Sequence, residues 1–515
     1  MKKIAIVLLS LSVLNVPKIF AQNDADVLRL SQLNPSTTAR SAALAGATGA
    51  LGGDFSCASN NPAGLAMYRN SEFTFSPSVY AGSSSTNYLG TANSDSRIGF
   101  GFGNIGFVAK NNYTVKGKPA TKGWTGVAFA FGINKLANFS NNVTYTGFNK
   151  ASSIGDYYAQ SLSGKGITPQ NALSTDPMGA GLAYDAYLLD ANYPDTTNYT
   201  AINRGGNVNQ TYSSITHGAV NEMTFSLAGS WDNRLFVGGT VGIPIVNYYN
   251  QITYGETLNP NDTMSQHYGF NSFNSTQSIT TSGAGINLKL GALFLVNDYL
   301  RLGLAVHTPT YYSLSDKSTL TMTTVRTDSS YGGTYSSVTD NTINYNIITP
   351  WRFIGSGALV FKKFGFITVD YELMDYTSSH IQFSNGSASD INYATAINQT
   401  ISNNYNSFSS NIRIGGELKY DIFALRVGYA YYSSPFNNKA PYDAAPFTDY
   451  NQTRQIISFG AGIREHDYFF DMSVQRTIYK STDSPYVFDG GSVASPLATI
   501  TTNKTMVMAT IGFKF

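Results

Sequence analysis

The sequence predicts an all-β protein, a transmembrane antiparallel β-barrel of about 14 strands with an N-terminal hatch that plugs its lumen. Three observations lead to this prediction. Apolar and polar residues alternate over stretches of about nine or more residues, the length that a tilted membrane strand needs. Short turns alternate with long polar loops along the chain. Only 12 % of the 515 residues are charged, about half of the roughly 25 % found in soluble domains.

The low charge is what a lipid-facing surface requires, because an Arg or Lys at the middle of the bilayer costs about 2–4 kcal/mol. The 35 Tyr and 31 Phe suit the two membrane interfaces, where amphipathic rings are favoured. A formal charge of +2 argues against a nucleic-acid binder, which needs a basic excess. A soluble β-solenoid or sandwich would explain the alternation, but not the low charge or the rhythm of the loops.

Residues 1–21 have the layout of a secretory signal peptide. Lys2 and Lys3 precede an apolar run from Ile4 to Leu14, and Ala21 stands at a plausible cleavage point. This apolar run is too short to cross a bilayer, which takes about 20 residues. We therefore expect the chain to be exported and, as a barrel, to reside in the bacterial outer membrane.

Residues 22–71 differ from the rest of the chain and are expected to form the hatch. The stretch Ser41–Leu51 is rich in Ala and Gly, does not alternate, and suits a short helix or a packed loop. An Asn-Pro-Ala motif, formed by Asn61, Pro62 and Ala63, follows shortly before the first strand. Small residues let a backbone pack closely inside a lumen. A periplasmic tail is the alternative, but this stretch is too apolar to be solvated.

Residues 72–515 are expected to form the barrel. The final strand shows the alternation most clearly, since Val507, Ile511 and Phe513 share one face. The aromatic residues Phe513 and Phe515 at its end are the candidate terminal signal for barrel assembly. The number of strands is even, as closure requires when both termini lie in the periplasm. The expected strands start near residues 72, 96, 122, 219, 234, 277, 299, 345, 365, 407, 423, 452, 467 and 498.

The connections predict the orientation of this barrel. Short turns are expected at Asp232-Asn233, Asn297-Asp298, Lys362–Phe364, Asp421-Ile422 and Glu465-His466. Long polar loops are expected near residues 256–268, 327–342, 385–402, 436–451 and 481–497, and the longest near 148–220. In outer-membrane barrels the short turns lie on the periplasmic side and the long loops outside. Within the longest loop, Pro177–Leu189 is a candidate amphipathic helix, which suits either a ligand-catching lid or packed loop structure.

The third expected strand contains a candidate break that would allow lateral opening. Alternate residues stay in step from Thr125 to Ile133, and the register then fails. The candidate break consists of Gly132, Asn134 and Lys135. A bulge or an inward kink there would leave backbone groups unpaired and open a gap in the wall. The alternative is that the strand simply leaves the membrane near Asn134.

The run from Ala39 to Met67 resembles the N-terminal hatch of the FadL/TodX family, outer-membrane transporters of long-chain fatty acids and aromatic hydrocarbons. It has an Ala-Gly-rich stretch and then the Asn-Pro-Ala motif just before the first strand. A hatch inside fourteen strands is that family's architecture, so the resemblance covers nearly the whole mature chain. It implies passive uptake, in which a small hydrophobic molecule is caught among the outer loops, passes to a pocket beside the hatch and leaves sideways into the membrane.

Two other functions remain open from the sequence. Some barrels that resemble this family are subunits or plugs of protein-secretion complexes, and long loops rich in Tyr, Asn and Ser suit protein contacts. A haem receptor or an outer-membrane enzyme is the third alternative. Against it, the five His residues show no metal-binding spacing, and the dinucleotide-like run Gly101–Gly106 lies within an expected strand. We therefore expect no enzyme activity, no cofactor and no metal site.

The expected partners follow from this interpretation. They are a small hydrophobic ligand, the lipids of the outer membrane and the barrel-assembly machinery. In the secretion alternative, other outer-membrane proteins join them. No nucleic acid is expected among the partners.

Overall fold

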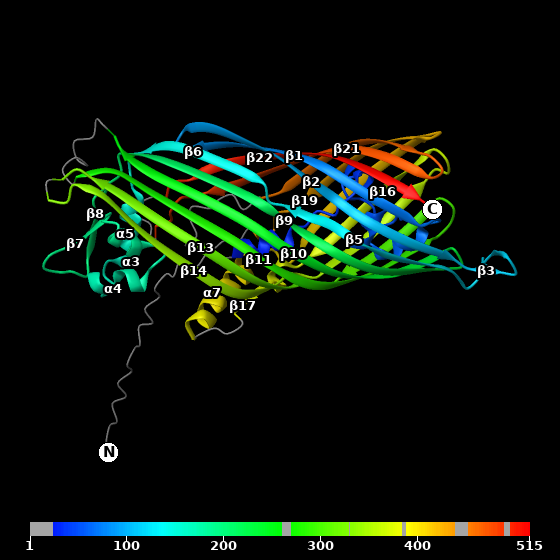
Figure 1. Ribbon diagram of the computed structural model, residues 1–515, viewed down its shortest axis with the longest axis horizontal. Coiled ribbons are helices and arrows are strands. Elements are labelled where there is room, and N and C mark those ends of the chain that lie inside the picture. The colour runs from blue at the N-terminus through cyan, green and yellow to red at the C-terminus, as the bar shows by residue number, and fades with distance from the viewer. Residues whose placement is uncertain (1–23, 260–268, 329, 384–387, 438–451, 489–494) are drawn as a thin grey trace, which may run out of the picture.

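The computed structural model describes residues 24–259, 269–328, 330–383, 388–437, 452–488 and 495–515. They form a long barrel of tilted antiparallel strands (Figure 1). The expected signal peptide, residues 1–21, lies outside the described residues. The sheet closes on itself because β1 (Glu72–Tyr88) pairs with β2 (Thr91–Asn112) along one edge and with β22 (Ala498–Lys514) along the other. The predicted closed antiparallel barrel is confirmed.

The wall is 14 strands around. We call each of these 14 positions a stave, which consists of either one strand or two strand segments in line. Four staves consist of two strand segments in line, namely β5 with β6, β12 with β13, β14 with β15 and β16 with β17, since each pair of segments shares a neighbouring stave. The strands between β2 and β22 are β5 (Trp124–Asn138), β6 (Asn141–Asn149), β9 (Val208–Trp231), β10 (Leu235–Leu258), β11 (Phe270–Leu295), β12 (Leu300–His307), β13 (Tyr311–Arg326), β14 (Gly333–Ile348), β15 (Arg352–Val360), β16 (Gly365–Met374), β17 (His380–Gln382), β18 (Ser409–Tyr420), β19 (Phe423–Tyr432), β20 (Arg454–Arg464) and β21 (Tyr468–Asp483).

An apolar belt surrounds the end of the barrel that carries the short turns. Along β19 the pattern is strict, because Leu425 and Val427 are exposed while Ala424 and Arg426 face the lumen. The same alternation recurs on the other staves, with exposed side chains at Phe129, Leu227, Val237, Leu290, Leu304, Phe353, Ile367, Ile414, Phe459, Met472 and Val507. A continuous apolar band of this kind is the surface that a bilayer covers.

All five predicted short turns join neighbouring strands at this end of the barrel. The connection between β9 and β10 shows the local cause. Asp232 and Asn233 both have φ of 52°, and such left-handed pairs form the tight type I′ turns whose twist matches that of the flanking strands.

Several predicted loops are wrong, because the strands are longer than expected. Residues 327–342 are mostly β14, and β9 begins at Val208 instead of near residue 219, which shortens the predicted loop 148–220. The predicted loop 385–402 is largely helix α7 (Ala388–Asn404). In β14 the residues are polar on both faces, as expected of a strand that continues beyond the lipid into water. Apolar alternation therefore marked only the part of each stave that faces lipid.

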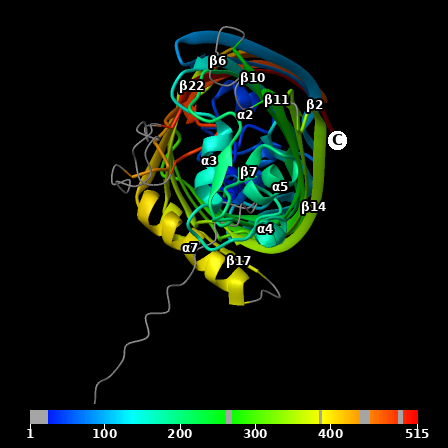
Figure 2. The same cartoon turned by 90° about the vertical axis from the view of Figure 1, so that its left-hand side faces the viewer.

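The longest loop folds over the open end of the barrel. It contains α3 (Ile154–Leu162), α4 (Pro169–Thr175), α5 (Ala180–Asp185), β7 (Leu189–Ala191) and β8 (Tyr199–Ala201), which lie across the mouth in Figure 2. Its buried side chains, such as Leu182 and Leu188, form one cluster with Phe270 and Phe273 of β11. The candidate helix over Pro177–Leu189 is only one turn and a half long, and it is packed into this cluster.

The N-terminal segment, residues 24–71, lies inside the barrel (Figures 1 and 2). It consists of α1 (Asp24–Ser31), α2 (Ala39–Ala43) and two short 3-10 helices, η1 (Phe55–Ser59) and η2 (Pro62–Met67). Thr38 caps α2 by accepting from the backbone N–H of Ser41. None of the helices in the described part of the chain is both long and apolar enough to span a bilayer.

An arginine in the apolar belt should destabilise the barrel. In Val427→Arg the guanidinium replaces a side chain that is 51 % exposed at the middle of β19. We expect the free energy of unfolding to fall by about 2–4 kcal/mol, measured by urea titration in phospholipid vesicles. Tyr420→Arg, beside a short turn, is the matched control and should cost about 1 kcal/mol or less. An equal loss in both variants would contradict a lipid-facing belt.

Candidate functional site: a lumenal cavity beside the N-terminal segment

Buried carboxylates of the wall hold the backbone of the N-terminal segment. Asp370 of β16 accepts hydrogen bonds from the backbone N–H groups of Thr48 (3.1 Å) and Gly49 (3.0 Å) and from the side-chain amide of Asn60 (3.3 Å). The guanidinium of Arg413 lies 3.7 Å from the same carboxylate. A buried charge is tolerable when it is paired and fully bonded, and Asp370 meets that condition through groups of the segment itself.

Other polar side chains of the wall also form hydrogen bonds to the N-terminal segment. Glu222 of β9 accepts from the hydroxyl of Ser59 (2.9 Å) and pairs with Lys289 of β11 at 2.5 Å. The ring Nε2 of His307 lies 2.7 Å from the carbonyl oxygen of Asn60. In the described part of the chain, His307 thus serves as a packing and hydrogen-bonding group between wall and segment.

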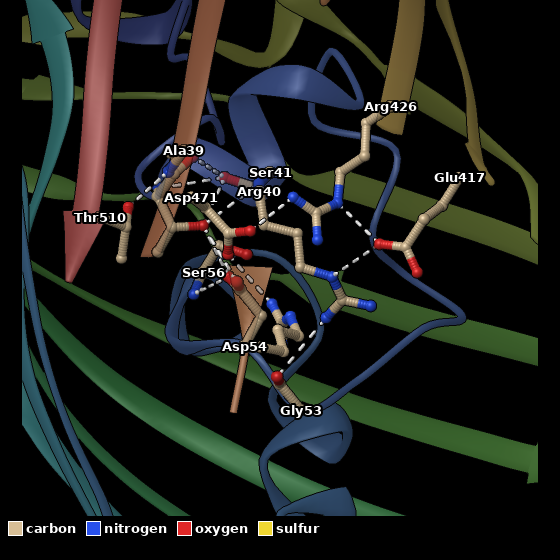
Figure 3. A network of polar contacts seen from close by, with 12 residues as sticks. Ala39, Arg40, Ser41, Gly53, Asp54, Ser56, Glu417, Arg426, Asp471 and Thr510 are labelled. Atoms are coloured by element: carbon tan, nitrogen blue, oxygen red, sulfur yellow. Dashed lines mark hydrogen bonds and ion pairs between the residues drawn. The ribbon is translucent and has the colours of Figure 1, made fainter. Parts of the chain in front are cut away.

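A third set of contacts is drawn in Figure 3. Arg40 of α2 donates to the carbonyl of Gly53 (3.4 Å) and forms an ion pair with Glu417 of β18 at 3.9 Å. Arg426 of β19 bonds Glu417 and Asp471, each at 2.6 Å. The Arg40–Glu417 pair joins the segment to the wall, whereas Arg426 links three wall strands, β18, β19 and β21, around that contact.

The Asn-Pro-Ala motif lies at the start of η2, against the wall. Asn61 accepts from the backbone N–H of Ala63 as the helix cap and donates to the carbonyls of Gly49 (2.7 Å) and Ala292 (3.2 Å). Gly291 is required opposite it, since a Cβ there would lie 2.0 Å from the Asn61 oxygen. The Asn-Pro-Ala motif therefore packs against the wall where Gly291 leaves room for it. The sequence alone did not link this glycine to the motif.

Cys57 is buried at the centre of this packing. Burial, and then the charge of Asp54, raises the pKa of the Cys57 thiol to about 12, from an ordinary value of 9.0. The neutral thiol is therefore favoured in the folded state. Its contribution to stability is fully present below about pH 9 and is lost as the pH rises through about 12.

The third stave is irregular next to the residues predicted for the break. Gly132 and Asn134 pair regularly with β9, and Asn134 is the last residue of β5 that pairs with β2. The register shifts between Lys135 and Ala137, and the stave is interrupted between β5 and β6. Gly132 serves another purpose, since a Cβ there would lie 2.5 Å from the ring of Phe55 in the N-terminal segment. The register shift therefore adjoins Lys135, one of the three predicted residues, and lateral opening at this place stays a prediction.

Beyond this point β6 pairs with β9 but forms no ladder with β2 in the described residues. Side chains replace the ladder. Ser84 of β1 donates to the carbonyl of Asn142 (2.6 Å), and Thr86 of β1 donates to the carbonyl of Thr144 (2.8 Å). Hydroxyls of β1 point into the lumen, so β6 passes on the lumenal side of β1. The wall is therefore not a continuous sheet between β2 and the upper third stave.

A lumenal cavity of about 320 Å³ adjoins this irregularity. It is bordered by α1 and the following loop of the N-terminal segment, by β1 and β2, and by the turn between β5 and β6. Its apolar part consists of Tyr80, Leu136, Ala137, Phe139 and Met506. The cavity thus touches both the N-terminal segment and the interrupted stave.

Five cations line the cavity, which are Arg29, Arg97, Arg454, Lys480 and Lys504, and its described lining includes no Asp or Glu. Arg29 is neutralised by Asp26 at 2.5 Å. Three of the others contact neutral groups, since Arg97 donates to the amide oxygen of Asn142, Lys504 donates to the carbonyl of Asn138 (3.5 Å), and Arg454 stacks over the Tyr432 ring at 4.1 Å. The buried Nε of Arg454 has no hydrogen-bond partner among the described residues. A positive charge that has no carboxylate partner among the described lining residues, beside apolar walls, suits an amphiphile with an acidic group.

Sequence reasoning missed these cations. The sequence feature that could have found them is the alternation of inward and outward side chains along a strand. Lys504, for example, shares the inward face of β22 with Met506 and Met508. This alternation places a side chain in the lumen but does not say which cations meet there, because they come from separate staves and from α1.

At the end of β22, Phe515 stacks on Phe107 with ring centroids 5.9 Å apart, and Phe513 is exposed in the belt.

Comparisons with known proteins were made on this geometry. No protein-family model matches the chain. No curated protein matches it either. Among solved structures, the P. putida toluene transporter TodX is 12 % identical with a TM-score of 0.52, covering 93 % of this chain and 98 % of that one. A Pseudomonas aeruginosa FadL homologue is 11 % identical with a TM-score of 0.53, covering 94 % and 100 %. At this identity the likeness establishes a shared fold over nearly the whole of both chains.

Removing the Asp370 carboxylate should loosen the N-terminal segment. Asp370→Ala leaves three donors and Arg413 without their acceptor, a loss of about 3 kcal/mol or more for a buried pair. We expect Cys57 to react with a maleimide about 100-fold faster in the folded variant than in the wild type, because 3 kcal/mol is about two decades in an opening equilibrium.

The control for this experiment is Asp340→Ala, which removes an exposed carboxylate of β14 that accepts a hydrogen bond from the Thr319 hydroxyl. Its labelling rate should equal that of the wild type at every pH between 7 and 9. Equal labelling of the two variants would show that Asp370 does not hold the segment.

Proposed function

We propose that this protein is an outer-membrane channel for passive uptake of small hydrophobic molecules, with the N-terminal segment acting as a hatch and the third stave as a lateral exit. The observation that carries this proposal is the place of the cavity. It lies between the N-terminal segment and the interrupted stave, so a ligand held there is next to a wall that lacks a ladder. The two similar structures are those of a toluene transporter and a FadL homologue, which supports a hydrophobic ligand.

The lateral route is supported by the bonding of the hatch. Passage straight through the lumen would break its contacts to the buried Asp370 and Glu222 and to Glu417, whose side chain is 11 % exposed. A sideways route breaks none of them. The ladder between β2 and β5 extends over nine pairs, from Asn104–Asn134 to Asn112–Gly126, or about 21 Å at a tilt of 45°. This is close to the height of the lipid belt, about 25 Å, so the ladder ends near the outer surface of the bilayer.

The ligand that the cavity favours is an acid with an apolar body. The cations of the cavity would hold a carboxylate, while Tyr80, Phe139 and Met506 would contact the hydrocarbon part. A neutral aromatic hydrocarbon would gain only the apolar contacts. The loop over the barrel mouth, residues 150–207, is proposed as the lid above this path, and Phe513 and Phe515 as the terminal signal for assembly.

Filling the cavity beside the interrupted stave should slow transfer. In Ala137→Trp the indole enters the cavity, and we expect transfer of cis-parinaric acid into outer-membrane vesicles to fall at least tenfold. The control Ala461→Trp adds the same group to an exposed, outward position on β20 and should leave the rate unchanged. If Ala137→Trp transfers the acid at the wild-type rate, this cavity is not on the path.

The charge of the ligand is tested by removing two cations. We expect the double variant Arg454→Gln, Lys504→Gln to bind cis-parinaric acid about 10–100-fold more weakly, since each charge-assisted bond contributes about 1.5–3 kcal/mol before losses. Binding of pyrene, which has no charge, should be unchanged. Equal losses for both probes, measured by fluorescence titration in detergent, would contradict recognition of an acidic group.

A further inference from the structure

The outer surface of the barrel carries an apolar groove near the end with the short turns. The groove has a volume of about 450 Å³ and lies over β5, β9, β10 and β11. None of its lining residues is charged, and its outward-facing side chains are Trp124, Val127, Leu227, Val237 and Leu290. It is separate from the lumenal cavity, because these side chains belong to the lipid-facing belt.

A glycine of β9, Gly229, lets the indole of Trp124 lie close against the wall of the groove. Gly229 of β9 lies between Val127 and Val237 in the ladder. A Cβ at Gly229 would lie 2.6 Å from the ring of Trp124, so the indole covers a site that only glycine leaves open. Trp231 packs edge-on against Trp124, with ring centroids 5.4 Å apart. Paired indoles are typical of the membrane interface, which places the groove at the level of the inner-leaflet headgroups.

A basic hairpin borders the groove on the side of the short turns. It runs from Tyr113 to Ala120 through β3 (Thr114–Val115) and β4 (Lys118–Pro119), and it projects beyond the barrel end in Figure 1. Tyr113 at its root also lines the groove. Lys116 and Gly117 at its tip have φ of 51° and 74°, as in a type I′ turn.

The charges around this hairpin are mostly of one sign. Lys116, Lys118 and Lys122 are exposed, and Arg234 is exposed on the neighbouring turn. The carboxylate of Asp232 in that turn accepts from the backbone N–H of Gly123 at 2.6 Å. The local balance is therefore four cations against one carboxylate, next to an apolar groove that opens toward the membrane.

The geometry points to a binding site for an anionic phospholipid of the periplasmic leaflet. One acyl chain lies in the groove beside Trp124, between Val237 and Leu290, and the phosphate group meets the hairpin lysines. The charge selects an anionic headgroup over a zwitterionic one, because lysines beside a membrane surface attract anionic lipids. This inference requires that the apolar belt faces lipid, but it does not depend on transport through the lumen.

The test is native mass spectrometry of the detergent-purified full chain with phosphatidylglycerol or phosphatidylethanolamine of identical acyl chains. The wild type should bind phosphatidylglycerol at least fivefold more tightly. The triple variant Lys116→Ser, Lys118→Ser, Lys122→Ser should bind the two lipids equally. The control Lys362→Ser, Lys363→Ser removes exposed cations from another short turn and should keep the preference.

The groove is tested separately by filling it. Val237→Trp should lower the binding of both lipids at least tenfold, whereas Val427→Trp, on the lipid face of β19, should not. A heat-dependent shift in electrophoretic mobility confirms that each variant is folded. Equal binding of the two lipids by the wild type would overturn the headgroup assignment. Unchanged binding in Val237→Trp would overturn the groove as the site.

Discussion

The structure depends on one constraint, which is that backbone N–H and C=O groups in hydrocarbon must be paired within the sheet. Closure of β1 on β22 meets it, because no strand edge is left in the lipid belt at that seam. The alternating faces, the aromatic interfaces and the low overall charge follow from this closed wall. The composite staves obey the same constraint, since β11 pairs with β13 up to Ile286 and with β12 from Lys289, and Leu288 between them bonds Thr308.

Closure creates a lumen, and filling it raises a second electrostatic requirement. Where the N-terminal segment packs on the wall, charges are paired and bonded, as at Asp370, Glu222 and Arg426. In the cavity the situation is reversed, because Arg97 and Arg454 have neutral partners. The paired charges fix the segment in one position. In the proposed function, the cavity cations without a carboxylate partner among the described residues would bind the ligand.

The constraint is relaxed at one place that matters for the proposed function. Between β2 and β6 the ladder is absent, and hydroxyls of Ser84 and Thr86 bond the freed carbonyls instead. Such side-chain bonds can exchange with water more easily than a ladder can, provided that the site lies outside the hydrocarbon. The nine-pair ladder below it covers roughly the depth of the bilayer, so pairing is continuous in the hydrocarbon and ends near its outer surface.

The sequence by itself determined the barrel, its number of staves, its short turns and the inward or outward parity of each side chain, because lipid imposes a period of two on every spanning strand. It placed the N-terminal segment apart through composition and the motif at Asn61–Ala63. It failed where lipid no longer acts on the pattern, as in the polar strand β14. Only the tertiary structure decided where the third stave departs from the wall and which glycine lies against Asn61. It also decided that Arg97, Arg454 and Lys504 share one cavity. These depend on strand tilt and on contacts between distant staves, which alternation along one strand does not encode.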